Sequence, residues 1–187
     1  MGMRCLLVIL GLSGLAWSQD GGRNRVTLSA GSARQINAKH STPETAPVVG
    51  IGYGRRILPF MEIEAGVTVG LQPSPAMRGA FYDYDPNDRY IWVPFGVRFV
   101  APLVAHRLEF SAGGGGLFER YSISNPDAPF GFGSHNGWGG YVSAGAALAV
   151  DRRHRFWLGV TPRALLANPK YGRDRWFTLT GDVSVRF

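Results

Sequence analysis

The sequence contains almost no cysteine, almost no lysine and no long apolar run. Cys5 is its one cysteine and lies close to the amino-terminus, and only Lys39 and Lys170 among its 20 basic residues are lysines. A helix that spans a membrane needs about 18 or more consecutive apolar residues. The absence of such a run excludes a helical membrane protein, and the single cysteine excludes an internal disulfide framework.

Metal-ligand patterns and clustered charge are also missing, which narrows the possible chemistry. The histidines show no spacing typical of a metal site. They are His40, His106, His135 and His154. The formal net charge of +7 comes from arginines scattered singly along the chain, whereas a nucleic-acid site needs a basic stripe or patch. We therefore expect no metal, no cofactor and no nucleic-acid partner.

The first residues have the composition of a targeting segment. Arg4 supplies a positive charge, residues 5–16 are apolar, and Ala16 and Ser18 are small residues at the two positions that a signal peptidase reads. The apolar run is too short to serve comfortably as a membrane-spanning anchor. We expect residues 1–18 to be a cleaved signal peptide and residues 19–187 to form one domain without cysteine.

The end of the chain alternates between two kinds of side chain. Every second residue from Phe177 to Phe187 is apolar or glycine, and the residues from Thr178 to Arg186 between them are polar. This period of two is that of a β-strand with one apolar and one polar face. The pattern recurs along the chain and indicates eight strands. They are expected at residues 25–36, 48–56, 60–71, 89–101, 107–121, 137–150, 155–166 and 174–187.

The connections between the expected strands are alternately short and long. Successive connections of an up-and-down barrel lie at opposite rims, so the short turns gather with both termini at one rim and the long loops gather at the other. The sequence therefore predicts an all-β fold, an eight-stranded antiparallel up-and-down transmembrane β-barrel. Pro94 and Pro162 remove ladder donors inside expected strands, so we expect bulges or local gaps there. The four glycines 113–116 predict a bend or close packing across the lumen.

The two faces of the strands differ in a way that favours a membrane. The polar face is mostly Gly, Ser and Thr with a few charges of both signs, which suits the cramped interior of a narrow barrel. The other face is apolar and carries no charge, as a lipid-facing band requires. The alternative is a soluble secreted ligand-binding barrel, in which the apolar face would lie inside.

Six charged residues of the polar face are expected to pair and plug the lumen, the alternative being a gate or a narrow ion path. They are Glu62, Glu64, Arg98, Glu109, Arg163 and Asp182. Aromatic residues near the expected strand ends suggest two interfacial girdles. The turn-side residues are Phe60, Phe110, Phe156, Trp157 and Phe187, and the loop-side residues are Phe118, Tyr121, Trp138, Trp176 and Phe177.

Three segments carry a resemblance to a known family. They are the terminal strand from Phe177 to Phe187, the segment Ile91-Trp92-Val93-Pro94-Phe95-Gly96-Val97-Arg98-Phe99, and residues 112–116. These segments resemble the small eight-stranded outer-membrane barrels of the OmpA transmembrane domain and OmpX type. The resemblance implies a porin-like monomer in the outer membrane of a Gram-negative cell envelope, in contact with outer-membrane lipid, with periplasmic termini and extracellular long loops.

The same resemblance implies an assembly signal at the carboxy-terminus. In this family a terminal phenylalanine and the alternating apolar residues before it are recognised by the outer-membrane assembly machinery. The matching residues here are Phe177, Leu179, Val183, Val185 and Phe187.

The sequence predicts a structural or surface-interaction role rather than an enzyme. Five aromatic residues in the expected long loops are candidates for binding a surface partner. They are Phe81, Tyr82, Tyr84, Phe130 and Phe132. Lipid A deacylases, which are also eight-stranded barrels, place a histidine two residues before a serine, whereas Ser134 directly precedes His135 here. A lipid A-modifying enzyme and a small pore are the less favoured alternatives.

Overall fold

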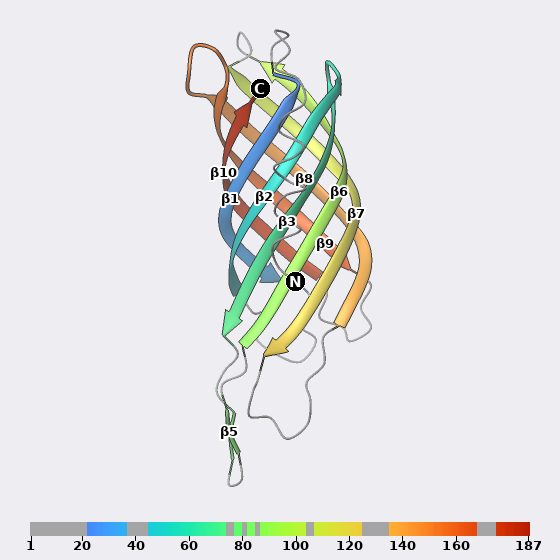
Figure 1. Ribbon diagram of the computed structural model, residues 1–187, viewed down its shortest axis with the longest axis vertical. Helices are drawn as coiled ribbons and strands as arrows, with labels where there is room; N and C mark the ends of the chain where they lie inside the picture. The colour runs from blue at the N-terminus through green and yellow to red at the C-terminus, as the bar shows by residue number, and fades with distance from the viewer. Residues whose placement is uncertain are drawn as a thin grey trace, which may run out of the picture.

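Eight strands close into one barrel in the computed structural model (Figure 1). The model describes residues 22–36, 45–73, 77–79, 82–84, 87–103, 107–124, 135–167 and 175–187, with the backbone alone for the strand residues between 72 and 88 and between 123 and 135. The barrel strands are β1 Asn24–Gln35, β2 Thr45–Leu58, β3 Met61–Pro73, β6 Asn87–Leu103, β7 Leu108–Ser124, β8 His135–Ala149, β9 Phe156–Ala167 and β10 Arg175–Arg186. Their order around the barrel is β1-β10-β9-β8-β7-β6-β3-β2.

Every strand pairs antiparallel with its neighbours, which confirms the predicted fold class. All eight expected strands are present, with ends within about three residues of the expected ones. The largest differences, of three residues, are at the end of β7 and at the start of β2, which begins at Thr45 and so includes Pro47. Pro47 is exposed, and a proline at the beginning of a strand costs little pairing. Within the described residues, no helix is long and apolar enough to cross a membrane.

A small second sheet lies in the connection between β3 and β6. It consists of β4 Met77–Gly79 and β5 Tyr82–Tyr84, paired antiparallel. Figure 1 shows β5 projecting past the end of the barrel opposite the carboxy-terminus. The sequence predicted only a loop here, because three-residue strands are too short to show a period of two.

The first and last strands close the barrel. Residues Arg25 to Gln35 pair with Arg186 to Trp176 without interruption. Two further backbone bonds join the ends, from Asn24 N to Phe187 O at 2.9 Å and from Phe187 N to Asn24 O at 3.0 Å. Closure leaves no free edge among the barrel strands, so each strand finds ladder partners on both sides.

Each strand proline lies at a gap in the ladder on one side of its strand, which confirms the predicted local gaps. The β3–β6 ladder runs to the pair Ala65–Phe95 and resumes at Thr68–Trp92, skipping the positions opposite Pro94. The β8–β9 ladder likewise skips the positions opposite Pro162. In both ladders the register is the same on either side of the gap, so no bulge forms. Each proline keeps a partner on its other side, Leu117 and Leu179 respectively.

The turn between β8 and β9 is organised by one carboxylate. Asp151 accepts hydrogen bonds from the backbone N–H groups of Arg153, Arg155 and Phe156, at 3.2, 2.8 and 2.8 Å. Desolvation acts in the opposite direction, but these three donors hold the pKa of Asp151 below its usual value. His154 in the same turn has a positive φ of 54°, so the short connection is tightly bent.

The run of glycines in β7 allows close approach to the neighbouring strand β6. Gly96 and Gly115 are paired directly. A Cβ added to Gly115 would collide with the Phe95 carbonyl oxygen, and one added to Gly96 would collide with the Gly114 carbonyl oxygen. The atoms nearest an added Cβ at the four glycines 113–116 all belong to the adjacent strands β6 and β8, so the glycines serve packing between neighbouring strands rather than the contact across the lumen that the sequence suggested.

This crowding predicts a selective effect of alanine. Gly115→Ala should lower the free energy of unfolding by about 1–3 kcal/mol, because backbone atoms of β6 have to move. Gly181→Ala is the matched control, since its added Cβ would meet only the Ala30 carbonyl oxygen at 3.9 Å. Denaturant titration of the two folded variants in micelles measures the difference. Equal stability of the two variants would contradict this explanation.

Candidate functional site in the barrel lumen

The side chains of the barrel strands alternate between the lumen and the outer surface. Val67 and Val183 on the outer surface are 40% and 50% exposed, whereas Glu62 and Glu109 in the lumen are each 2% exposed. The apolar side chains therefore lie outside and the charged side chains inside, an arrangement opposite to that of a water-soluble barrel.

Charged side chains from six strands meet in the lumen near the short-turn rim. We call this set the charged cluster. It consists of Arg25, Arg56, Glu62, Arg98, Glu109 and Arg186. Arg186 and Glu109 come from β10 and β7, which are not neighbouring strands, so the cluster bridges the bore.

Glu109 binds three arginines of the charged cluster. Its two carboxylate oxygens each accept a hydrogen bond from Arg186 Nη2 at 2.7 Å. Arg98 Nη2 donates at 3.0 Å and Arg56 Nη2 at 3.3 Å. The guanidinium of Arg186 also lies over the ring of Trp157, 4.2 Å from its centroid, which adds a cation–π contact on the turn side.

Glu62 contacts the same three arginines and also Arg25. Its carboxylate oxygens lie 3.2 Å from Arg25 Nη2, 3.0 Å from Arg56 Nη2, 3.4 Å from Arg98 Nε and 3.9 Å from Arg186 Nη2. Both carboxylates are almost completely buried, and a buried carboxylate is tolerated only when it is paired and hydrogen-bonded. Each glutamate therefore depends on arginines that the other also holds in place.

The six residues that the sequence nominated do not form a single network. Glu62, Arg98 and Glu109 belong to the charged cluster. Glu64 lies at its border, 3.5 Å from Arg25, and accepts a hydrogen bond from the Tyr141 hydroxyl at 2.9 Å. The other two residues lie farther along the lumen.

Arg163 and Asp182 are held by neutral partners. The guanidinium of Arg163 lies 5.7 Å from the centroid of the Tyr141 ring. Asp182 accepts hydrogen bonds from the hydroxyls of Thr161 and Thr180. Among the described side chains, Arg163 and Asp182 form no ion pair with each other or with a third residue.

Three arginines of the charged cluster were missing from the nomination: Arg25, Arg56 and Arg186. The alternation already contained the signal, because Arg186 shares the face of Asp182 and Arg25 shares the face of Ser29. Arg186 was placed on the polar face of its strand but was not assigned to the paired set. Their pairing with Glu62 and Glu109 depends on contacts across the bore, which a strand-by-strand reading does not contain.

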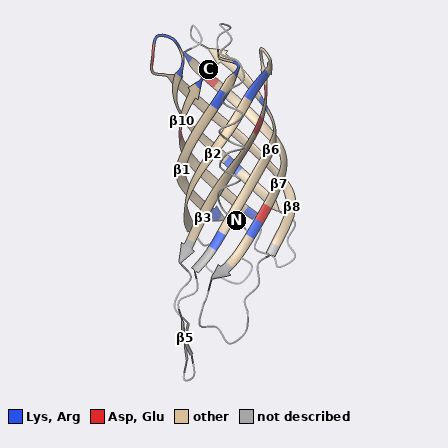
Figure 2. Ribbon diagram, viewed as in Figure 1, with Lys and Arg blue, Asp and Glu red and all other residues tan. Residues whose placement is uncertain are grey.

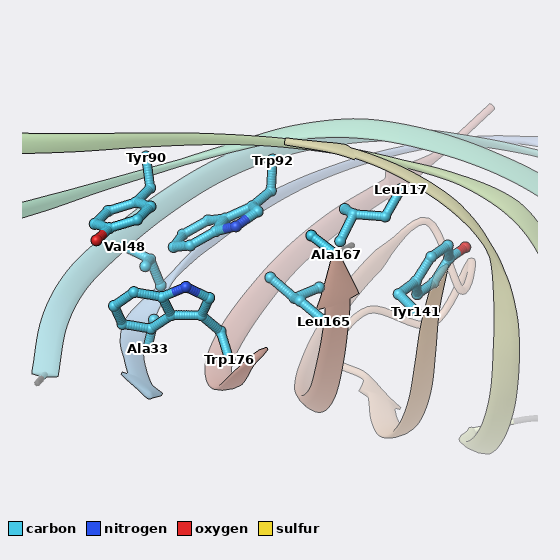
Figure 3. Packing of buried hydrophobic residues seen from close by; sticks show 9 residues of the cluster. All are labelled: Ala33, Val48, Tyr90, Trp92, Leu117, Tyr141, Leu165, Ala167 and Trp176. Carbon is cyan, nitrogen blue, oxygen red and sulfur yellow. The ribbon is translucent and has the colours of Figure 1, made fainter. Parts of the chain in front are cut away.

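Aromatic side chains fill the lumen near the long-loop rim (Figure 3). We call Tyr90, Trp92, Tyr121 and Trp176 the aromatic cluster. The Tyr90 ring lies 5.4 Å from that of Trp92 and 4.8 Å from those of Tyr121 and Trp176, centroid to centroid. The indole N–H of Trp92 donates a hydrogen bond to Glu119 at 2.7 Å. Aliphatic residues complete the packing: Ala33, Val48, Leu117, Leu165 and Ala167.

The aromatic cluster corrects two expectations. Trp176, Tyr121 and Trp157 were assigned to interfacial girdles but point into the lumen, because they share the alternation of the polar residues on their strands. The lumen is also not polar throughout, since it is charged at one rim and mainly aromatic at the other, where Glu119 is also buried. The remaining predicted girdle residues lie on the outer surface. They are Phe60, Phe110, Phe118, Trp138, Phe156, Phe177 and Phe187.

A cavity of about 60 Å³ lies between the charged cluster and the aromatic cluster. Hydroxyl-bearing side chains dominate its wall. They include Thr27, Ser29, Thr68, Ser111, Ser143 and Thr161. Glu64, Arg163 and Asp182 also line it. A polar space of this size has room for several water molecules, so the middle of the lumen is suited to hydration while both ends are packed.

The assembly-signal residues and the loop residues nominated from the sequence are not among the lumen residues described above. The candidate assembly residues Phe177, Leu179, Val183, Val185 and Phe187 all lie on the outer surface of the last strand and the residue after it. Phe81, Phe130, Phe132 and Ser134 lie outside the described residues, and only the backbone is described at Tyr82, Tyr84 and His135. Within the described residues, no group of three or more His, Cys, Asp or Glu side chains is placed to hold a metal ion.

Comparison with solved structures finds small barrels that match nearly the whole chain. Ail, the attachment invasion locus protein of Yersinia pestis, aligns over 89% of this chain and 99% of its own, with 10% identity and a TM-score of 0.62. Neisserial surface protein A aligns over 88% and 97%, with 15% identity and a TM-score of 0.66. OprG from Pseudomonas aeruginosa aligns over 90% and 99%, with 9% identity and a TM-score of 0.57.

The chain has the fold of the small eight-stranded outer-membrane barrels. The resemblance seen in the sequence is thereby confirmed at the level of fold. No family model matches the sequence, and no curated protein matches it. With identities of 9% to 15%, these likenesses establish the fold alone.

The charged cluster generates a direct prediction. Glu109→Gln should lower the free energy of unfolding by about 3–5 kcal/mol, because three partly buried arginines lose the buried carboxylate that they share. Glu64→Gln is the control and should cost clearly less, since Glu64 contacts one arginine at 3.5 Å and is partly exposed. Chemical unfolding monitored by tryptophan fluorescence measures both. Equal losses would show that the cluster is not organised around Glu109.

Proposed function

We propose that this chain is an integral protein of the bacterial outer membrane with a structural or surface-interaction role and a closed lumen. The observation that carries the proposal is the band of exposed apolar side chains around the barrel. It includes members from all eight barrel strands, such as Leu28, Ile51, Val67, Phe95, Phe110, Val142, Leu158 and Val183. Water-soluble monomers rarely expose continuous apolar patches larger than a few hundred Å².

The backbone supports the same location. A lipid environment offers no hydrogen-bond partners, so a membrane-spanning sheet has to be closed. The barrel meets this requirement through the continuous β1–β10 ladder. On β10 the uncharged outward row runs from Phe177 to Phe187. At about 3.4 Å per residue and a tilt of about 40°, this row spans about 26 Å along the barrel axis, close to the ~25 Å apolar band of outer-membrane barrels.

The packing of the lumen supports a structural rather than a transport or catalytic role. The charged cluster crosses the bore at one rim and the aromatic cluster fills it at the other. The lumen residues nominated from the sequence would then act together with Arg25, Arg56 and Arg186 to hold the strands at a fixed radius. We propose no enzymatic activity.

Interaction would take place at the long-loop rim. The proposed orientation places the termini and short turns in the periplasm and the long loops, with β4 and β5, outside the cell. One similar structure is Ail in complex with the heparin analogue sucrose octasulfate, which supports surface-ligand binding as a role for a barrel of this shape. The loop aromatics named from the sequence remain candidates for such contacts.

Two further proposals concern the export of the protein and its assembly into the membrane. Residues 1–18 would direct export and be removed, and the outward-facing residues from Phe177 to Phe187 would be recognised by the outer-membrane assembly machinery. The folded protein would be a monomer. Cell fractionation, with proteolysis of intact cells to locate the long loops, tests location and orientation together.

The proposed membrane location predicts a position-dependent effect of charge. Val183→Arg, near the middle of the outward row of β10, should destabilise the barrel in lipid vesicles by about 2–4 kcal/mol. Val150→Arg, at the short-turn rim, should cost about 0–1 kcal/mol. Denaturant unfolding from vesicles measures both variants. If neither substitution has an effect, the exposed face is in water and the proposal is wrong.

The closed lumen predicts the behaviour of the barrel in a planar bilayer. The wild type should show no stable conductance steps. Because the charged cluster closes the other rim, steps should appear only when Trp92→Ala and Trp176→Ala are combined with Glu109→Ala and Arg186→Ala. Trp138→Ala is the control, because Trp138 is exposed on the outer surface. Heat-modifiable migration in gels first establishes that each variant is folded. Steady conductance of the wild type would contradict the closed lumen.

A further inference from the structure

All outward-facing charges on the barrel strands have one sign. Among the described side chains of the eight barrel strands, the charged residues on the outer surface are Arg34, Arg55, Arg89, Arg120 and Arg175, all exposed. The sequence predicted an uncharged outer face, and this holds between the rims but not at them. Arg55 lies near the short-turn rim, and the other four lie near the long-loop rim. Figure 2 shows basic positions on β6 and β7 toward the end from which β5 projects.

The four arginines at the long-loop rim form two diagonal pairs on adjacent strands. Arg34 on β1 is paired in the ladder with Phe177, and Arg175 lies two residues from Phe177 on β10. Arg89 on β6 is paired with Ser122, and Arg120 lies two residues from Ser122 on β7. Diagonal neighbours of this kind have Cβ atoms about 7–8 Å apart, within reach of long side chains.

The two pairs have the same geometry and lie on opposite sides of the barrel. In the strand order, β1 and β10 are four positions away from β7 and β6 in a ring of eight. In each pair one arginine lies nearer the loops: Arg175 on β10 and Arg89 on β6. Both of these strands start at the long-loop rim. Two adjacent positive charges repel each other, so each pair is energetically unfavourable unless an anion neutralises it.

The depth of the arginines indicates where that anion lies. Arg175 is two residues beyond Phe177, the end of the uncharged row of β10. Two residues of a strand tilted by about 40° correspond to about 5 Å along the axis. Arg34 is paired with Phe177 itself, so the guanidinium groups of this pair lie between the edge of the hydrocarbon band and the level of Arg175. They point sideways from the barrel wall, at the level of lipid head groups rather than above the rim.

No described carboxylate competes for these arginines. None of the four forms an ion pair with a described residue, and the described acidic side chains of the barrel strands all face the lumen. Two guanidinium groups presented together match the geometry of a phosphate, which arginine binds through paired N–H donors.

We propose that each arginine pair binds a phosphate group of a lipid A-type glycolipid in the outer leaflet, so that the barrel has two lipid sites on opposite sides. This inference rests on the proposed membrane location and orientation. The sites would fix the rotation and depth of the barrel in the leaflet, because each one ties two neighbouring strands to one head group.

The test uses the full barrel folded in detergent micelles and lipid A carrying both phosphates as the probe. Native mass spectrometry counts the lipid molecules retained by the wild type, by R34Q/R175Q, by R89Q/R120Q and by the quadruple variant. R55Q is the matched control, since Arg55 is outward-facing but at the opposite rim. Lipid A without phosphates and inorganic phosphate are the comparison ligands.

We expect the wild type and R55Q to retain two lipids, each double variant one, and the quadruple variant none, with affinity reduced by about ten- to a hundredfold for each lost site. Equal retention by the quadruple variant would overturn the inference. So would equal binding of the phosphate-free lipid, which would point to acyl chains, or displacement by inorganic phosphate at matched concentration, which would point to a free-anion site.

The failure of this inference is distinguishable from the failure of the proposed function. If the wild type inserts into vesicles and migrates as a heat-modifiable barrel but does not prefer phosphorylated lipid A, only the lipid sites are wrong. If it does not insert into vesicles at all, the membrane location itself is wrong, and the lipid sites are refuted with it.

Discussion

The backbone ladder between β1 and β10 is the constraint on which the rest of the structure depends. It joins the first and last strands of the barrel over eleven paired positions, from Arg25–Arg186 to Gln35–Trp176. Once the sheet is closed, every side chain of a strand has only two possible directions, into the bore or away from it. The small tolerated defects, at Pro94 and Pro162, interrupt single ladders without changing the register. The alternation along each strand is therefore the same before and after each proline.

A narrow bore then decides what the inward residues must be. Eight strands leave just enough space for side chains, and this chain fills that space in three layers. Buried glutamates and largely buried arginines neutralise one another at the short-turn rim, hydroxyl groups surround a small polar cavity in the middle, and aromatic rings pack at the long-loop rim. Tyr141 connects these layers, because its hydroxyl donates to Glu64 while its ring lies beneath Arg163.

The outer surface is ordered along the same axis. Branched and aromatic side chains occupy the middle, and arginine is the charged residue at both ends of the outward rows. Arginine thus appears in two environments of this barrel: inside, where carboxylates pair with it, and outside near the rims, where the described residues offer no carboxylate. This division suggests why arginine so far outnumbers lysine in the chain, since its planar group suits both buried carboxylates and phosphates.

The sequence by itself determined the strands, their in-and-out alternation and the up-and-down order, because these follow from a period of two and from loop lengths that alternate along the chain. The alternation also placed Arg186 on the polar, inward face and contained the inward direction of Trp176, although the preference of aromatic residues for interfaces concealed the direction of Trp176. Only the tertiary structure decided which inward residues meet. Arg186 reaches Glu109 across 77 residues of chain, between strands that are not neighbours, and the two outward arginine pairs exist only because the register places Arg34 beside Phe177 and Arg89 beside Ser122. Such contacts depend on closure and register, which are properties of the whole sheet and of no single strand.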